Sequence, residues 1–378
     1  MKRINYILIF TLFLAACEKN ISDFQHQNFI KLFSGGSETF GFHVAEVVEG
    51  GYVAVGYTST SQFRRQVFVA RTDKAGNSLW QRSFGTEHNE EGRIVKIDNN
   101  EIVVAGTKTN FITGNAETFL LRLNMQGDSL TFKLLNIPNN LVVSDMIVSD
   151  GLVYVAGEKF SSNSSLANYF IACIDNSGSV IWNREYGNDQ GRQAYYKIFK
   201  KSNGNFLLVG STNALIGTTL NRISIIELNP QGVSVNAFYF ESSTDQIFGD
   251  AHFDGDGLFI LYSRIEGGFS KSYLCYFNGS IIWEYDNGIN GLATSLELID
   301  ETTLVLSCED EGSVAFYKIT YTSNGVDGVH ELKTYPGSIK STLTTNDKGI
   351  ICIGSTAPDY GSMMRLIKTD VDLFLLKP

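Results

Sequence analysis

The sequence predicts an all-β fold, a seven-bladed β-propeller of four-stranded antiparallel blades. Three observations lead to this prediction: one phrase recurs about every fifty residues, its copies are short β-branched and aromatic runs between glycine-rich turns, and no segment after residue 16 shows helical periodicity. Self-similarity at such a period is typical of solenoids, propellers and arrays. Short apolar runs bounded by turn residues indicate strands.

The clearest copy of the phrase begins at Gly50 and ends at Trp80. It contains an apolar run that closes on Gly56, a variable loop, a second apolar run and the turn Asp73–Gly76. Apolar runs without alternation indicate strands buried on both faces. An alternating strand with small and polar residues precedes the phrase, and a fourth strand follows it. We expect the first strand of each unit to line a central channel.

The spacing of the glycine in the second strand gives the number of units. This glycine recurs at spacings of 50, 51 and 53 residues, at Gly56, Gly106, Gly157 and Gly210. The 144 residues from there to Gly354 leave room for three further steps, and Tyr262 and Ser307 replace the glycine in the two intervening copies. Seven units are therefore predicted over residues 28–378. One small sheet cannot bury both of its faces alone, but sheets packed around an axis cover each other.

Two segments compete to close the ring. Phe29–Gly35 reads like the fourth strand at Leu79–Gly85, yet it precedes the first complete unit. It is expected to complete the last blade. Leu373–Leu376, after a tight turn at 371–372, is the alternative for the same position.

The first 16 residues predict a targeting segment. Lys2 and Arg3 precede a short apolar stretch, and Leu14-Ala15-Ala16-Cys17 resembles the lipobox of bacterial lipoproteins. The resemblance implies acylation of Cys17 and cleavage before it, so that 17–27 form a lipidated tether and acyl chains hold the protein to a membrane. Glu18, in place of aspartate, favours the outer membrane, on either its periplasmic or its surface side. The alternative is an ordinary secretory leader with a chance cysteine.

Composition excludes some classes of partner. Without Lys2 and Arg3 the chain has 28 basic and 40 acidic residues, a net charge of about −12 (28 − 40). Nucleic-acid binding needs a basic surface, so no such partner is expected. Apart from Cys17 the chain has four cysteines, without a CxxC pair, and they are expected to be free and buried: Cys173, Cys275, Cys308 and Cys352.

A family resemblance rests on the tryptophans. The Asp-x-x-Gly-x-x-x-Trp patterns at Asp73–Trp80 and Asp175–Trp182 resemble the tryptophan-docking repeats (PQQ-like repeats) of quinoprotein-like propellers, with a weaker copy ending at Trp283. The full phrase is similar to repeats in exported proteins of Bacteroidetes-type bacteria. Elsewhere Thr131, Asn236 and Leu332 take the tryptophan position, and the adjacent cysteine pair of quinoprotein dehydrogenases is missing. The resemblance therefore implies the fold, and no cofactor is predicted.

No catalytic or metal site is predicted from the residue pattern. The five histidines have no metal-ligand spacing: His26, His43, His88, His252 and His330. Asp254–Gly257 resembles the start of a calcium loop but lacks its later ligands, which favours a plain turn.

Five carboxylates fall on or near first strands: Glu46, Asp98, Asp145, Asp250 and Glu297. Two of them facing each other could serve glycoside hydrolysis, although solvation of the channel is the simpler interpretation. The loops between second and third strands vary most, and they carry Phe63, Phe111 and Tyr360.

Three functional hypotheses follow from the sequence. The favoured one is a non-enzymatic, lipid-anchored envelope propeller that binds a protein partner or serves as an assembly scaffold. The second is a surface glycan-binding lipoprotein, which requires a platform of coplanar aromatic rings. The third is a glycosidase or lyase, which requires two carboxyl groups converging at the channel mouth.

Overall fold

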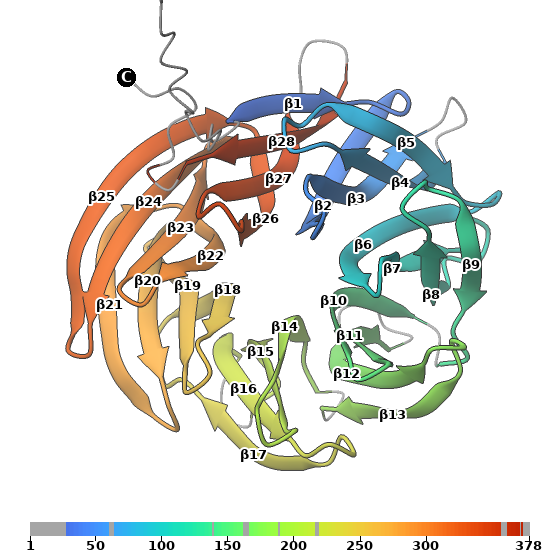
Figure 1. The fold of residues 1–378 in the computed structure, drawn as a ribbon. Coiled ribbons are helices and arrows are strands. Elements are labelled where there is room, and N and C mark those ends of the chain that lie inside the picture. Colours follow the sequence, from blue (N-terminus) through green and yellow to red (C-terminus); the bar gives the residue numbers. More distant parts are fainter. Residues whose placement is uncertain are drawn as a thin grey trace, which may run out of the picture.

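The computed structural model describes residues 28–59, 64–137, 140–161, 166–187, 190–215, 219–356, 361–370 and 372. In these ranges the regular elements are 28 strands in seven four-stranded antiparallel sheets. The sheets stand as blades around a central axis, which confirms the predicted seven-bladed β-propeller (Figure 1). The predicted leader, the tether and Cys17 lie outside the described residues.

In blades 1 to 6 the strands follow one another in chain order from the centre of the ring outward (Figure 1). Blade 1 has β2 (Glu38–Glu46), β3 (Tyr52–Ser59), β4 (Arg65–Thr72) and β5 (Ser78–Phe84). Blade 2 has β6 (Asn89–Asp98), β7 (Glu101–Thr109), β8 (Ala116–Leu123) and β9 (Ser129–Leu134). Blade 3 has β10 (Leu141–Ser149), β11 (Leu152–Phe160), β12 (Ala167–Asp175) and β13 (Val180–Tyr186). Blade 4 has β14 (Gln193–Lys200), β15 (Phe206–Thr212), β16 (Arg222–Leu228) and β17 (Ser234–Tyr239).

The later blades repeat this order. Blade 5 has β18 (Asp245–Phe253), β19 (Leu258–Glu266), β20 (Phe269–Phe277) and β21 (Ile281–Asn290). Blade 6 has β22 (Leu292–Asp300), β23 (Thr303–Asp310), β24 (Ser313–Thr322) and β25 (Gly325–Pro336). Blade 7 takes β26 (Ser338–Thr344), β27 (Ile350–Thr356) and β28 (Met363–Thr369) from the end of the chain, and β1 (Phe29–Phe33) from its beginning.

The N-terminal strand closes the ring. β1 pairs antiparallel with β28, from Phe29 opposite Lys368 to Phe33 opposite Met364. The two ends of the chain thus share one sheet (Figure 1), as the sequence predicted for Phe29–Gly35. The alternative segment Leu373–Leu376 lies outside the described residues.

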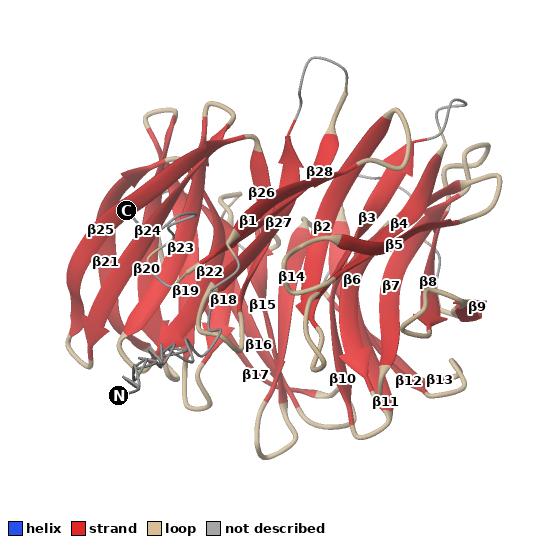
Figure 2. Ribbon diagram, turned by 45° about the horizontal axis from the view of Figure 1, so that its top comes forward, coloured by secondary structure: helices blue, strands red, loops and turns tan. Residues whose placement is uncertain are grey.

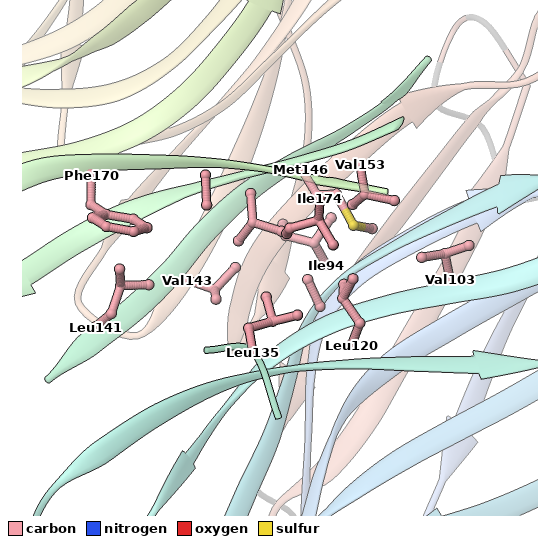
Figure 3. Packing of buried hydrophobic residues seen from close by; sticks show 13 residues of the cluster. Ile94, Val103, Leu120, Leu135, Leu141, Val143, Met146, Val153, Phe170 and Ile174 are labelled. Carbon is pink, nitrogen blue, oxygen red and sulfur yellow. The ribbon is translucent and has the colours of Figure 1, made fainter. Parts of the chain in front are cut away.

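The antiparallel connections give the ring two faces (Figure 2). The short turns between first and second and between third and fourth strands lie on one of them, which we call the turn face. The loops between second and third strands and the links between blades lie on the opposite loop face. Each core lies between two neighbouring blades, as between blades 2 and 3, where Leu120 and Val103 meet Phe170 and Met146 (Figure 3).

The repeated glycine lies inside the second strand, and not at its end as the sequence suggested. Gly106 pairs with Gly92, just before a β-bulge in β6. A Cβ atom on Gly106 would stand 2.2 Å from the carbonyl oxygen of Glu91. The first strand therefore approaches too closely for a side chain at this position, and the equivalent Gly56, Gly157 and Gly354 meet carbonyl oxygens in the same way.

Tryptophans on the outermost strands contact the next blade. The Trp80 indole Nε1 donates a hydrogen bond of 2.9 Å to the carbonyl oxygen of Met125, and its ring covers Gly127, where a Cβ would stand 2.9 Å away. Phe29 lies over Gly76 of blade 1 in the same manner. The N-terminal strand therefore supplies the seventh blade with an aromatic ring in the tryptophan position.

In blade 6 the strand pairing places a different residue at the tryptophan position from the one that the sequence pattern indicated. In blade 6 the residue equivalent to Trp80 is Val329, which pairs with Ile319, and not Leu332. The reason is that the β24–β25 hairpin is longer than its counterparts and lacks the Asp-x-x-Gly turn on which the pattern was aligned. The four cysteines within the described residues are free and buried, as predicted.

Ring closure leads to a prediction about stability. Replacing Phe29, which is 8% exposed, by alanine removes a buried ring from the junction of blades 7 and 1. We expect Phe29→Ala to lower the free energy of unfolding by about 3 kcal/mol, measured by urea denaturation. Leu32→Ala is the matched control, because Leu32 lies on the same strand but is 47% exposed. Equal effects of the two variants would contradict this account of closure.

Candidate functional site

The first strands of all seven blades surround a central channel, as the sequence predicted. The channel has a volume of about 1270 Å³. Each of these strands contains a β-bulge at the same height. The residue after the bulge therefore holds an equivalent position in every first strand. Ser295 of blade 6 is buried, and the other six line the channel: His43, Ile94, Asp145, Lys197, Asp250 and Ser341.

Two carboxylates of this wall connect neighbouring blades. Asp145 accepts a hydrogen bond of 3.0 Å from the backbone N–H of Ile198 in blade 4. Asp250 accepts one of 2.9 Å from the backbone N–H of Leu296 in blade 6. A first strand is the inner edge of its sheet, where backbone N–H groups lack a strand partner. The carboxylates supply the missing acceptors.

Two glutamates on first strands have similar roles. Glu297 accepts from the backbone N–H of Thr344 in blade 7 at 3.4 Å, and Glu46 accepts from that of Asn346 at 2.8 Å. Both line the channel. Asp98 does not, and its carboxylate lies 3.7 Å from the guanidinium of Arg122. Four of the five predicted carboxylates thus line the channel and hold blades together, a role that the sequence did not suggest.

Lys197 is the central cation of the wall. Its ammonium group lies 3.0 Å from Asp250, and 34% of its side chain is exposed, toward the channel. Burial alone would lower the pKa of Lys197, but the carboxylates of Asp250, Asp145 and Glu297 outweigh it, so the pKa lies above its usual value. Three carboxylates therefore act on one ammonium group at the channel wall.

His43 lines the channel. Burial, and then the positive charges of Lys96 and Lys197, hold its pKa well below 6.5. It is therefore neutral in the folded protein near pH 7. Its Nδ1 is buried and has no hydrogen-bond partner among the described residues. His252 is also on a first strand, and its Nδ1 lies 3.8 Å from Glu297.

The loop-face mouth of the channel carries a cluster that sequence reasoning missed. Arg93 lies over the ring of Phe42 at 4.4 Å and Arg65 over that of Tyr57 at 4.5 Å. Both guanidinium groups pair with Glu91. Phe42 and Arg93 are the bulge residues of their strands, and only the register shows that they line the mouth.

The variable loops are described in part. Phe111 is half exposed and lies beneath the guanidinium of Arg64, 4.8 Å from its ring centroid, with His88 nearby. Phe63 and Tyr360 lie outside the described residues. The near-parallel pair Tyr276 and Trp283 packs with buried Phe259 in the core between blades 5 and 6. It is not an open platform of the kind that the glycan hypothesis requires.

The Asp254–Gly257 segment forms a turn, as predicted. Asp254 accepts hydrogen bonds from the backbone N–H groups of Asp256 and Gly257 at 2.9 and 2.8 Å. Over the part of the chain that the structure describes, no group of three or more His, Cys, Asp or Glu side chains is placed to hold a metal ion. The same residues include no helix long and apolar enough to span a membrane.

Comparison with known proteins supports the fold. No known protein family matches the chain, and no curated protein is significantly similar to it. The α-L-arabinofuranosidase Arb93A of Fusarium graminearum superposes with a TM-score of 0.56 at 7% identity, over 91% of this chain and 97% of that one. The Dos1 propeller gives 0.54 at 12%, over 89% and 94%.

A third similar structure is the acylaminoacyl peptidase of Pyrococcus horikoshii, with a TM-score of 0.53 and 11% identity. The match covers 90% of this chain and 54% of the peptidase, so this chain spans about half the length of that protein. At these identities the likeness shows a propeller and nothing about activity.

The channel network leads to a prediction about stability. In Asp250→Asn a neutral amide replaces the carboxylate that pairs with Lys197. The positive charge of the ammonium group then loses its nearest negative partner. We expect the free energy of unfolding to fall by about 1–3 kcal/mol, measured by urea denaturation. Asp256→Asn, at an exposed turn position in the same blade, should change it by no more than about 0.5 kcal/mol. An unchanged Asp250→Asn protein would contradict the structural role of this carboxylate.

His43 should make stability depend on pH. Its folded pKa is below 6.5, so the unfolded chain takes up a proton first as the pH falls. Stability from His43 is therefore complete above about pH 6.5 and declines below it, by at most about 1.4 kcal/mol per pH unit. Denaturation between pH 7 and 5.5 should show this slope in the wild type and a smaller one in His43→Gln. His330→Gln, at an exposed position, should keep the wild-type slope.

Proposed function

We propose that this chain is a lipoprotein of the cell envelope, anchored through acyl chains on Cys17 in the outer membrane, whose propeller binds a protein partner or serves as an assembly scaffold without catalysing a reaction. The proposal joins two arguments. The lipobox-like leader supports the anchor, and an apolar band on the outer wall of the ring supports the binding role.

The band consists of bulge residues on the outermost strands. In blades 1 to 5 the fourth strand contains a bulge just after its turn. The extra residue is aliphatic each time and about half exposed: Leu79 at 59%, Leu130 at 49%, Ile181 at 55%, Val235 at 52% and Ile282 at 53%. We call these five residues the outer-wall band.

The band is the single observation that carries the binding role. Because its members hold equivalent positions, they lie at one height near the turn face and follow the wall from blade to blade. In blade 2 Phe132 and Leu134 extend it, and in blade 4 Val233 and Tyr239 do so. Exposed apolar residues at repeated positions offer a surface on which a partner can dock. The channel carboxylates, in contrast, are bound to neighbouring blades.

A binding experiment tests the proposal. The protein is immobilised and challenged with envelope extract and with a glycan panel. We expect it to retain envelope protein, and the triple variant Leu130→Ser/Ile181→Ser/Val235→Ser to retain at least tenfold less. The matched control is Val48→Ser/Ile112→Ser/Phe269→Ser, which removes three exposed apolar residues outside the band and should bind like the wild type.

Two results would overturn the proposal. Retention of glycans alone would favour the glycan-binding alternative, and equal retention by the two triple variants would remove the band from the binding surface. The anchor is tested separately. Mass spectrometry should find an acylated Cys17 at the N-terminus, and Cys17→Ser should release the protein from the membrane fraction.

A further inference from the structure

Arg365 stands at a position where five of the seven blades have an aromatic ring. In each blade one residue of the third strand pairs with the repeated glycine or its replacement. Five of these residues are aromatic and buried: Phe68, Phe119, Phe170, Tyr273 and Phe316. In blade 4 the residue is Ser224, whose hydroxyl forms a hydrogen bond with the hydroxyl of Tyr169 in blade 3. Blade 7 alone places a charge there, and Arg365 is only 4% exposed.

One edge of this guanidinium has no partner among the described residues. Nη1 donates to the carbonyl oxygen of Pro336. Nε and Nη2 are both buried and make no hydrogen bond. These two N–H groups form the side-on edge of arginine, which binds a carboxylate through two parallel hydrogen bonds. Gly337 borders this edge, since a Cβ there would stand 3.4 Å from Nη2.

A second unpartnered donor belongs to the same region. The Tyr335 hydroxyl, on the outermost strand of blade 6, is buried and makes no hydrogen bond in the described part of the chain, and the residue is 5% exposed. Burial raises the pKa of Tyr335 to about 12, against the opposing influence of Arg365. The hydroxyl is therefore protonated and can donate.

The charge of Arg365 lacks a described counterion. Burial is the largest influence on the pKa of Arg365 and lowers it, although Cys352 and Tyr335 act in the opposite direction. Burial also raises the pKa of the Cys352 thiol to about 12, so the thiol is neutral near pH 7. Arginine nevertheless stays charged in proteins, and a buried charge without a partner is costly.

We propose that Arg365 and Tyr335 form a binding site for one carboxylate group, between blades 6 and 7 near the loop face. The side-on edge of Arg365 holds both carboxylate oxygens, and the Tyr335 hydroxyl donates to one of them. A single negative charge balances the single guanidinium. A phosphate would bring about 1.5–2 negative charges at pH 7, and buried Ile339, Phe316 and Ile367 around the site offer no second cation.

Acetate is the probe that tests this site. The purified full chain is titrated with sodium acetate by calorimetry at pH 7.5, and thermal unfolding is followed in parallel with sodium chloride at matched ionic strength. We expect saturable acetate binding that raises the unfolding midpoint beyond the effect of chloride. Tyr335→Phe should weaken acetate binding roughly tenfold, because one hydrogen bond to a charged group is lost.

Two further variants separate the site from general effects. Arg365→Phe restores the aromatic residue of the other blades, so it should fold, and it should lose saturable acetate binding. Arg222→Met is the matched control, since Arg222 is also buried and donates to a backbone carbonyl, of Thr244. It should keep the acetate response. Absence of acetate binding in the wild type, or equal binding by Arg365→Phe, which would place the acetate elsewhere, would overturn the proposal.

Discussion

Each blade of this protein buries its faces only against its neighbours, so every blade depends on closure of the ring. A four-stranded sheet of this size has too little core of its own. The hydrophobic clusters accordingly join residues of adjacent blades, and one of them joins Phe29 and Phe33 to blade 1 and to the last strands of the chain. The N-terminal strand therefore supports all seven sheets, because without it the first and last blades would each expose an apolar face.

A second constraint acts at the inner edges of the sheets. Seven first strands surround the channel, and the backbone N–H groups on their inner edges need hydrogen-bond acceptors that no neighbouring strand provides. Asp145 and Asp250 supply them, and Lys197 compensates the charge that these carboxylates bring. The polar wall is thus part of the architecture.

Two features of the surface and core differ from what the repeat requires, and both are candidates for a functional role. The outer-wall band puts aliphatic side chains into solvent at positions that the fold leaves free. Arg365 puts a charge where the fold favours an aromatic ring. In the two proposals above, the band offers apolar surface to a protein partner and Arg365 offers two N–H donors to a carboxylate.

The sequence by itself determined the seven blades and their strand order, because glycine spacing and strand patterning are local and repeat seven times. It also indicated that Phe29–Gly35 closes the ring. A comparison with Leu79–Gly85 without gaps would align Ile30 with Trp80. The strand pairing instead places Phe29 at the position equivalent to Trp80. Only the tertiary structure decided the roles of Asp145, Asp250 and Arg365. Their partners lie in other strands and other blades, about 10 to 50 residues away along the chain. Bulge positions set which residues face the channel, and a bulge shifts facing by one residue without any mark in composition.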